Sequence, residues 1–147
     1  MKMPLIWINE REKSMGTFRN IDELTTATRS AFKKGGFYDG LQLVTLEGDK
    51  YIVQGAKKEY VINQGRIKTF LWKLIGGELY RVKLDLSDRS EISYSLLLAS
   101  ILQIVEKDEE YWDSDGLLEQ FKSKARNSNS IKELVELLDE KYNGEFH

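Results

Sequence analysis

The chain has 147 residues, 41% of them hydrophobic and 31% charged, which fits a single soluble globular domain and not a disordered chain. It contains no cysteine and one histidine, the terminal His147, so disulfides, thiol nucleophiles and thiolate metal sites are excluded. Residues 1–84 carry 15 Lys and Arg against 9 Asp and Glu, whereas residues 85–147 carry 7 against 15, so the two parts of the chain have net charges of +6 and −8.

The N-terminal segment predicts a strand followed by a helix. Residues 4–9, PLIWIN, are apolar and β-prone, and the run is too short for the core of a secretory signal. Residues 20–23, NIDE, resemble a capping box, in which the asparagine and the glutamate satisfy free amides at a helix start. Apolar residues near helical spacing continue to Gly35-Gly36, which favours a helix end. We therefore expect a helix over residues 20–36.

The middle of the chain has the alternating pattern of antiparallel strands. Apolar runs are separated by turns that contain glycine, and residues 78–86 alternate most clearly between apolar and charged side chains. The predicted strands span residues 41–46, 50–54, 59–62, 66–74 and 78–86. Together they predict a meander of about four or five strands with one face open to water.

From residue 87 onward the pattern is helical. A first helix, capped by Ser87 or Asp88 and running through Val105, is apolar almost all round, which predicts deep burial against the sheet. Its most apolar run, residues 92–105, is too short to span a membrane. A second helix is predicted from Leu117 to Ala125. A third starts with the capping box of residues 130–133, SIKE, and ends at Asn143-Gly144.

Strands followed by helices predict the α+β class, with one domain over residues 1–147. We expect an N-terminal strand and helix, an antiparallel meander, and three C-terminal helices packed on one face of the sheet. The absence of a signal, of a membrane-spanning run and of cysteine predicts a cytoplasmic protein with no membrane partner.

The stretch IVEKDEEYWDSDG, residues 104–116, gathers six carboxylates around a tyrosine and a tryptophan. As a calcium loop with Gly116 at its sixth position, it has Tyr111 at the first position and Lys122 at the last, where an acid and a bidentate glutamate are needed. Zinc would have only His147 as a nitrogen ligand. We therefore expect no metal and no cofactor.

Catalysis is not indicated by the same stretch. Glu109 and Asp113 are four residues apart and could share a helical face, but six neighbouring acids are not the distinct pair in a cleft that glycoside hydrolysis requires. A nucleophilic triad would have the terminal His147 as its base, which is poorly placed for that role. We expect a protein that is not an enzyme and has no catalytic residue.

Two interpretations of the stretch stay open. In the first it is a helix junction, where Asp113, Ser114 or Asp115 caps the next helix and Trp112 stays on the core stripe. In the second it is a docking surface for a basic protein, because the helix dipole disfavours carboxylates at a helix C-terminus and helix stability therefore does not explain them. The candidate partner-binding residues are Glu106, Asp108, Glu109, Glu110, Trp112, Asp113 and Asp115.

The basic half of the chain offers an alternative site on the sheet. Lysines, arginines and aromatic residues interleave along the predicted strands, as they do on sheets that bind single-stranded nucleic acid. The same pattern also suits the solvent face of an ordinary sheet, and a pI of about 5.6 argues against a dedicated nucleic-acid-binding protein. The residues of this alternative face are Arg66, Lys68, Phe70, Trp72 and Lys73.

The size of the chain, its α+β layout, the lack of a catalytic motif and the acidic cluster in its helical half resemble the small cytosolic immunity proteins of bacterial polymorphic or contact-dependent toxin systems. The likeness is to the class as a whole and carries over no individual residue. It implies a protein that binds a cognate toxin domain and blocks its active site. Many such toxins are basic nucleases, and the carboxylates would then occupy the place of nucleic acid. A nucleic-acid or small-ligand binding module is the alternative function.

Overall fold

The computed structural model describes residues 1–29, 32, 37–62 and 78–146. Its strands are β1 (Leu5–Asn9), β2 (Ser14–Phe18), β3 (Thr26–Thr28), β4 (Gln42–Val44), β5 (Asp49–Val61), β6 (Leu79–Leu86) and β7 (Ser90–Glu91). Its helices are α1 (Ile21–Leu24), α4 (Tyr94–Lys107), α5 (Glu109–Trp112), α6 (Leu118–Arg126) and α7 (Ile131–Tyr142). The antiparallel sheet and the C-terminal helices confirm the predicted α+β class.

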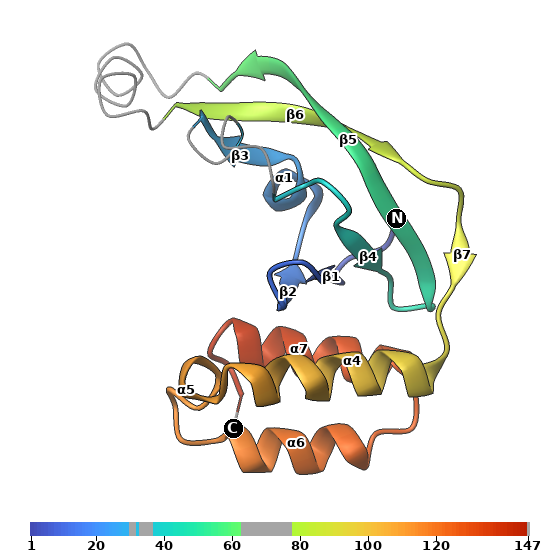
Figure 1. The fold of residues 1–147 in the computed structure, drawn as a ribbon, viewed down its shortest axis with the longest axis vertical. Helices are drawn as coiled ribbons and strands as arrows, with labels where there is room; N and C mark the ends of the chain where they lie inside the picture. The colour runs from blue at the N-terminus through green and yellow to red at the C-terminus, as the bar shows by residue number, and fades with distance from the viewer. Residues whose placement is uncertain (30–31, 33–36, 63–77, 147) are drawn as a thin grey trace.

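One curled antiparallel sheet holds the described strands in the order β2-β1-β4-β5-β6-β3, with β7 beside the start of β5. The consecutive neighbours β4, β5 and β6 form the predicted meander. The long strand β5 pairs with β4 through its first part and with β6 through the rest, and it curves along its length (Figure 1). Register shifts between Val53 and Gly55 and between Lys58 and Tyr60 accompany this bending, as β-bulges do.

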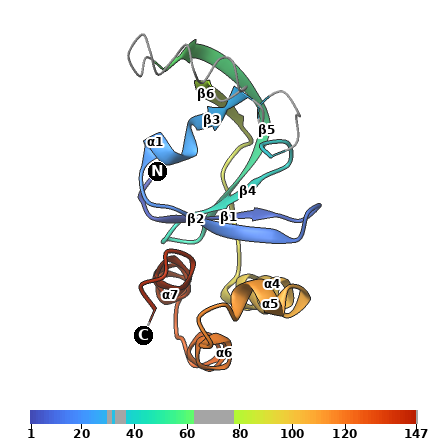
Figure 2. The same cartoon turned by 90° about the vertical axis from the view of Figure 1, so that its left-hand side faces the viewer.

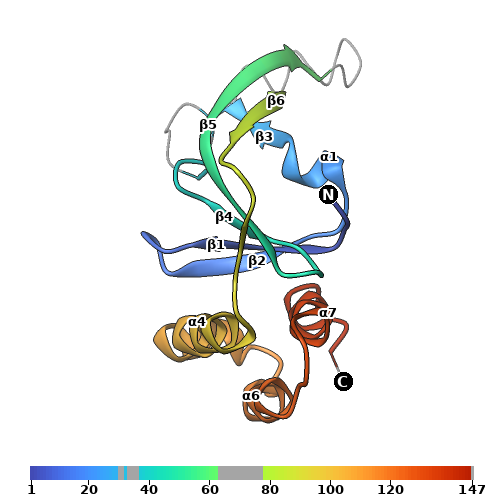
Figure 3. The ribbon, with the colours of Figure 1, turned by 90° about the vertical axis from the view of Figure 1, so that its right-hand side faces the viewer.

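The C-terminal helices form a layer on one face of the β1–β2 pair. Helices α4 and α7 both contact β2, and α6 lies against them on the side away from the sheet (Figures 2 and 3). Buried residues at helical spacing, such as Leu134 and Leu138 of α7, make this contact apolar. None of the helices in the described ranges has both the length and the apolar composition needed to cross a membrane.

Strand β1 is buried on both faces. Ile6 and Ile8 belong to the hydrophobic cluster under the helical layer, whereas Leu5 and Trp7 belong to a second cluster inside the curl of the sheet. Successive side chains of a strand point to opposite faces, so β1 contributes to both clusters. Burial on two sides explains why its sequence, LIWIN, is a continuous apolar run without alternation.

The prediction of one continuous helix over residues 20–36 is wrong in its described part, because a strand interrupts it. Its capping box forms, because the Asn20 side chain accepts a hydrogen bond from the Glu23 amide at 2.9 Å and the Glu23 carboxylate accepts one from the Arg19 amide at 2.7 Å. The helix nevertheless ends at Leu24, and residues 26–28 form β3, which pairs with β6. β-Branched threonines and the hydrogen-bonding edge of β6 outweigh the local helical spacing.

Two features of the sheet also differ from the prediction. Residues 50–54 and 59–62 were expected to be separate strands. Instead, residues 49–61 form one strand that contains β-bulges and no turn. Residues 14–18 were not predicted as a strand and form β2, which pairs along the whole of β1. The predicted strand over residues 66–74 and the helix end at Gly35-Gly36 lie outside the described residues.

In the helical part, the second and third helices are confirmed, and the first starts later than expected. Residues 90–91 pair with β5 as β7, so α4 begins at Tyr94, with the Ser93 hydroxyl accepting from the Leu96 amide at 3.2 Å. The prediction that α4 is buried on all sides is wrong, because Leu96 is 64% exposed. At the start of α7, the Ser130 hydroxyl accepts a hydrogen bond from the Glu133 amide, as predicted.

Candidate partner-binding site

The acidic segment, residues 106–115, runs from the end of α4 through α5 toward α6, at the end of the helical layer away from β7 (Figure 1). Its six acidic residues are all exposed. Trp112 is only 5% exposed and packs in the cluster under the helices, which confirms the core position expected from its spacing. The structure therefore exposes all the candidate acids along one short segment and buries Trp112 in the core beside them.

Asp115 is anchored by a lysine from another helix. The Lys141 ammonium on α7 lies 2.5 Å from the Asp115 carboxylate, and the Lys141 side chain is only 2% exposed. The hydrogen bond from Lys141 is the main cause that lowers the pKa of Asp115, while partial desolvation of the carboxylate opposes it. The ion pair ties the acidic segment to the last turn of α7.

A second buried lysine anchors Glu109. The Lys122 ammonium on α6 lies 3.3 Å from the Glu109 carboxylate and 3.4 Å from that of Glu119. Burial alone would lower the pKa of Lys122, but the hydrogen bond to Glu109 and the two negative charges outweigh burial and raise it. A longer contact of 3.9 Å joins Arg126 to Glu106, so three cations support the segment.

Two carboxylates of the segment also cap the next helix, as the junction interpretation predicted. The Asp113 carboxylate accepts a hydrogen bond from the Leu118 amide at 3.1 Å, and the Asp115 carboxylate accepts one from the Leu117 amide at 3.0 Å. Both amides lie at the start of α6, where backbone donors have no partner within the helix. Asp113 and Asp115 therefore have structural roles.

Asp108 and Glu110 differ from the other acids. Neither side chain forms a hydrogen bond or an ion pair with any residue that the structure describes, and both are exposed. Directly after Glu110, α5 also exposes Tyr111, 56% of whose surface is accessible. The charge that a partner could neutralise is therefore concentrated at Asp108 and Glu110, beside an exposed aromatic ring.

Tyr111 lies between two hollows in the surface. One, of about 220 Å³, lies between α5 and the β1–β2 hairpin, and the other, of about 170 Å³, lies between α5 and the end of α7. The first is lined by Trp7, Lys13, Ser14, Met15, Asp108, Tyr111, Trp112 and Tyr142. The second shares Tyr111, Trp112 and Tyr142 with it. We call the first one the aromatic hollow.

The sequence did not reveal the lysines beneath the acids or the role of Tyr111. Lys122 follows Leu118 by four residues and Lys141 follows Leu138 by three, so each lies on the apolar stripe of its helix. A lysine at such a position is a signal for a buried counter-ion. Tyr111 directly precedes the core residue Trp112, and a helix turns that neighbouring position away from the core.

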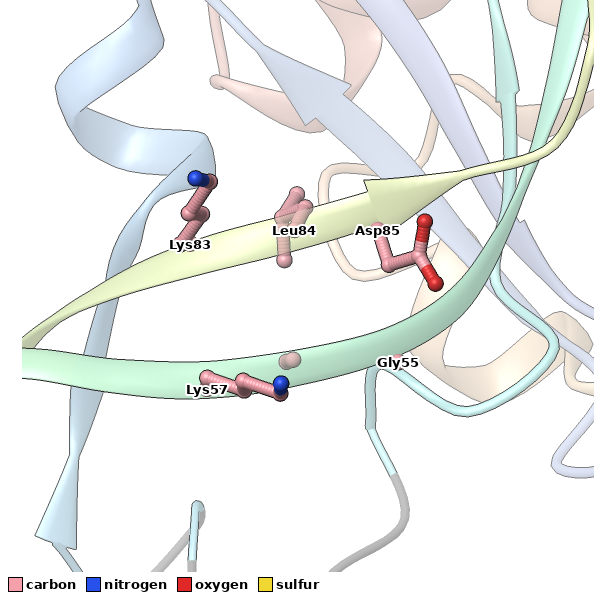
Figure 4. Close-up of a pocket in the computed structure, with 6 residues that line it drawn as sticks. Gly55, Lys57, Lys83, Leu84 and Asp85 are labelled. Carbon is pink, nitrogen blue, oxygen red and sulfur yellow. The ribbon is translucent and has the colours of Figure 1, made fainter.

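On the sheet, the described part of the basic region forms a ribbon between β5 and β6. Lys57 pairs directly with Lys83 across the two strands, and Gly55 pairs with Asp85. A hollow of about 400 Å³ borders these residues, and Figure 4 shows the Asp85 carboxylate directed toward β5. Like charges directly opposite each other destabilise a strand pair, and an anion between them would relieve the repulsion.

The alternative nucleic-acid face was predicted at five other residues. Arg66, Lys68, Phe70, Trp72 and Lys73 all lie outside the described residues.

Within the described ranges, no three or more Asp, Glu or His side chains gather as a metal site. In comparisons with protein-family models, with curated proteins and with solved structures, nothing matches this chain.

Proposed function

We propose that the protein is a non-enzymatic, cytoplasmic immunity or inhibitor protein that binds a basic toxin domain through the acidic segment and blocks its active site. The observation that carries the proposal is the exposure of six carboxylates between residues 106 and 115, with Asp108 and Glu110 unpaired among the described residues. Carboxylates gathered in this way attract a basic surface and accelerate its association.

The support beneath the segment favours binding as well. The buried lysines Lys122 and Lys141 hold Glu109 and Asp115 in place before any partner arrives. A surface ordered in advance loses less conformational entropy when it binds. The likeness to immunity proteins in size, layout and acidity points in the same direction.

The test compares two double variants that change the net charge equally. Asp108→Asn/Glu110→Gln removes the unpaired charges of the acidic segment, and Asp88→Asn/Glu91→Gln removes two exposed charges near β7, at the other end of α4. Each variant and the wild type are used to capture partners at low salt, and an identified basic protein is then tested for binding and for inhibition of its activity.

The proposal predicts that the wild type and the β7 control bind and inhibit that protein, whereas Asp108→Asn/Glu110→Gln binds at least several-fold more weakly, mainly through slower association. The melting temperatures of all three proteins should agree. Equal affinity of the two double variants would show that the acidic segment is not the docking surface.

The Lys57–Lys83 pair favours a second candidate, a nucleic-acid binding module that uses the β5–β6 ribbon. A single-stranded oligonucleotide should then raise fluorescence anisotropy at low salt, and Lys57→Glu/Lys83→Glu should abolish the change. Lys68→Glu/Lys73→Glu tests the face that was predicted from the sequence. An oligonucleotide that does not bind even at low salt rules this candidate out.

A further inference from the structure

We propose that the aromatic hollow receives an arginine side chain of the basic partner, with Tyr111 as the ring on which the guanidinium stacks. This role for Tyr111 rests on the proposed function and adds to it the residue type that the partner presents. The anchor expected from the sequence was Trp112, but Trp112 is buried, and the exposed ring beside the hollow belongs to Tyr111.

The ring of Tyr111 is held in place from below. Its centroid lies 5.2 Å from that of Trp112, and the two rings are almost perpendicular, at 89°. Trp112 belongs to the hydrophobic cluster under the helices, so it is a fixed support. An exposed aromatic ring on a rigid support offers contact area at little cost in conformational entropy, which is typical of binding hot spots.

The other walls of the hollow are also aromatic. Tyr142 lies 6.5 Å from Trp112 and 6.3 Å from Trp7 between ring centroids, so the rings form a continuous series from α5 to β1. Met15 of β2 completes the apolar wall. The volume of about 220 Å³ greatly exceeds the roughly 10–15 Å³ that one water needs, so the hollow can hold a side chain.

Charge decides which side chain fits. Asp108 is among the residues that line the hollow, and its carboxylate has no cation partner among the described residues; Glu110 lies two residues further along the exposed segment. A purely apolar side chain would leave the Asp108 carboxylate without a cation partner. An arginine places its methylene stem against Met15 and the rings, stacks its planar guanidinium on tyrosine, and donates two hydrogen bonds to one carboxylate.

Lys13 also lines the hollow and favours arginine over lysine as the side chain that enters it. Its ammonium opposes any entering cation, so the cation must gain more from the site than Coulomb attraction to Asp108 alone. A guanidinium gains from stacking and from two-point hydrogen bonding, whereas a lysine ammonium is compact and strongly hydrated. The hollow should therefore select arginine over lysine.

The experiment uses hexa-arginine and hexalysine as probes of the full-length protein at low salt. Binding is followed by the NMR signals of the Trp7 and Trp112 indole N–H groups, since both rings line the hollow. We expect hexa-arginine to shift both signals and to bind at least about five-fold more tightly than hexalysine, a difference of about 1 kcal/mol.

Variants assign this preference to the hollow. Tyr111→Ala should remove the preference for arginine, and Tyr111→Phe, which keeps the ring, should retain it. Lys13→Asn removes the opposing charge and suits the positive backbone φ of 54° at this position, so it should strengthen hexa-arginine binding. Tyr60→Ala, at an exposed tyrosine of the β5–β6 ribbon, is the matched control and should have no effect.

The outcomes separate this inference from the proposed function. If Asp108→Asn/Glu110→Gln weakens both peptides but Tyr111→Ala keeps the arginine preference, the acidic surface stands and the arginine site is wrong. If neither change affects either peptide, both proposals fail. Larger indole shifts with N-acetylphenylalanine amide than with N-acetylarginine amide would assign the hollow to an apolar side chain and overturn the inference.

Discussion

The Lys141 ammonium lies 2.5 Å from the Asp115 carboxylate, across the space between α7 and the start of α6. Asp115→Asn leaves the almost fully buried ammonium without its counter-ion, so we expect the free energy of unfolding to fall by roughly 1–3 kcal/mol, less than for a fully buried pair because Asp115 is partly exposed. Urea denaturation at pH 7 measures the change. Adding Lys141→Met should restore part of the loss, whereas a wild-type midpoint for Asp115→Asn alone would contradict a structural role for the pair.

The same pair should contribute to acid sensitivity. The folded-state pKa of Asp115 is held below its ordinary value of 3.8, mainly by the hydrogen bond from Lys141. The folded protein therefore binds this proton less readily than the unfolded chain does. The stabilisation from Asp115 is present above the ordinary pKa and is lost as the pH falls through the lower folded value. Unfolding free energies between about pH 5 and 2 should fall more steeply for the wild type than for Asp115→Asn, and parallel curves would contradict this assignment.

An alkaline transition is expected from Tyr38. Burial raises the pKa of this phenol from 10.0 to about 12, and its hydroxyl donates to the Leu24 carbonyl at 2.9 Å. The folded state keeps the proton that the unfolded chain releases above pH 10. The contribution of Tyr38 to the free energy of unfolding is therefore fully present below pH 10 and is lost as the pH rises toward 12. The loss should be on the order of 1–2 kcal/mol. Tyr38→Phe should lose part of this dependence. Urea midpoints measured at pH 9 and 11 provide the check, and an unchanged slope in the variant would argue against Tyr38 as its source.

Gly16 is required by the close approach of α7 to β2. A Cβ atom at this position would lie 2.7 Å from the Tyr142 ring and 2.8 Å from the Trp7 ring. Gly16→Ala should therefore lower the melting temperature, with a loss of about 1–3 kcal/mol from overpacking. Gly55→Ala is the matched control, because a Cβ on this other strand glycine meets nothing within 4 Å. Equal melting temperatures for the two variants would mean that the rings move away at no cost.

Features that depend on a few neighbouring residues were predictable from the sequence. The capping boxes at residues 20–23 and 130–133 both form, because their hydrogen bonds join residues within one helical turn. The helix that follows the first box ends at Leu24 and is succeeded by β3, since β6 supplies hydrogen-bond partners from 51 to 55 residues away. Strand β2 was missed for a similar reason. Gly16 weakens its strand pattern, and the need for glycine there becomes clear only from the contact with Trp7 and Tyr142.

In the candidate site, too, some features were predictable from the sequence and others were not. The burial of Trp112 followed from its spacing to Val105 and Ile101, and capping by Asp113 and Asp115 followed from their position before a helix. The counter-ions of the segment could not be assigned, because Lys122 and Lys141 belong to other helices and meet the acids only in the folded chain. As a result the sequence could not separate the acids that have a lysine or arginine partner from Asp108 and Glu110, which have none among the described residues.

Strand β1, which has both faces buried and both edges paired, links the helical layer, where the proposed binding surface lies, to the curled sheet. Because its edges are paired and its side chains are buried, we expect its amides to exchange with solvent deuterium only when the helical layer and the sheet open together. A ligand that binds only the folded state slows such exchange by the factor 1 + [L]/Kd. Deuterium uptake of Ile6, Trp7 and Ile8 therefore reports occupancy of the acidic segment from a strand that the partner does not have to touch.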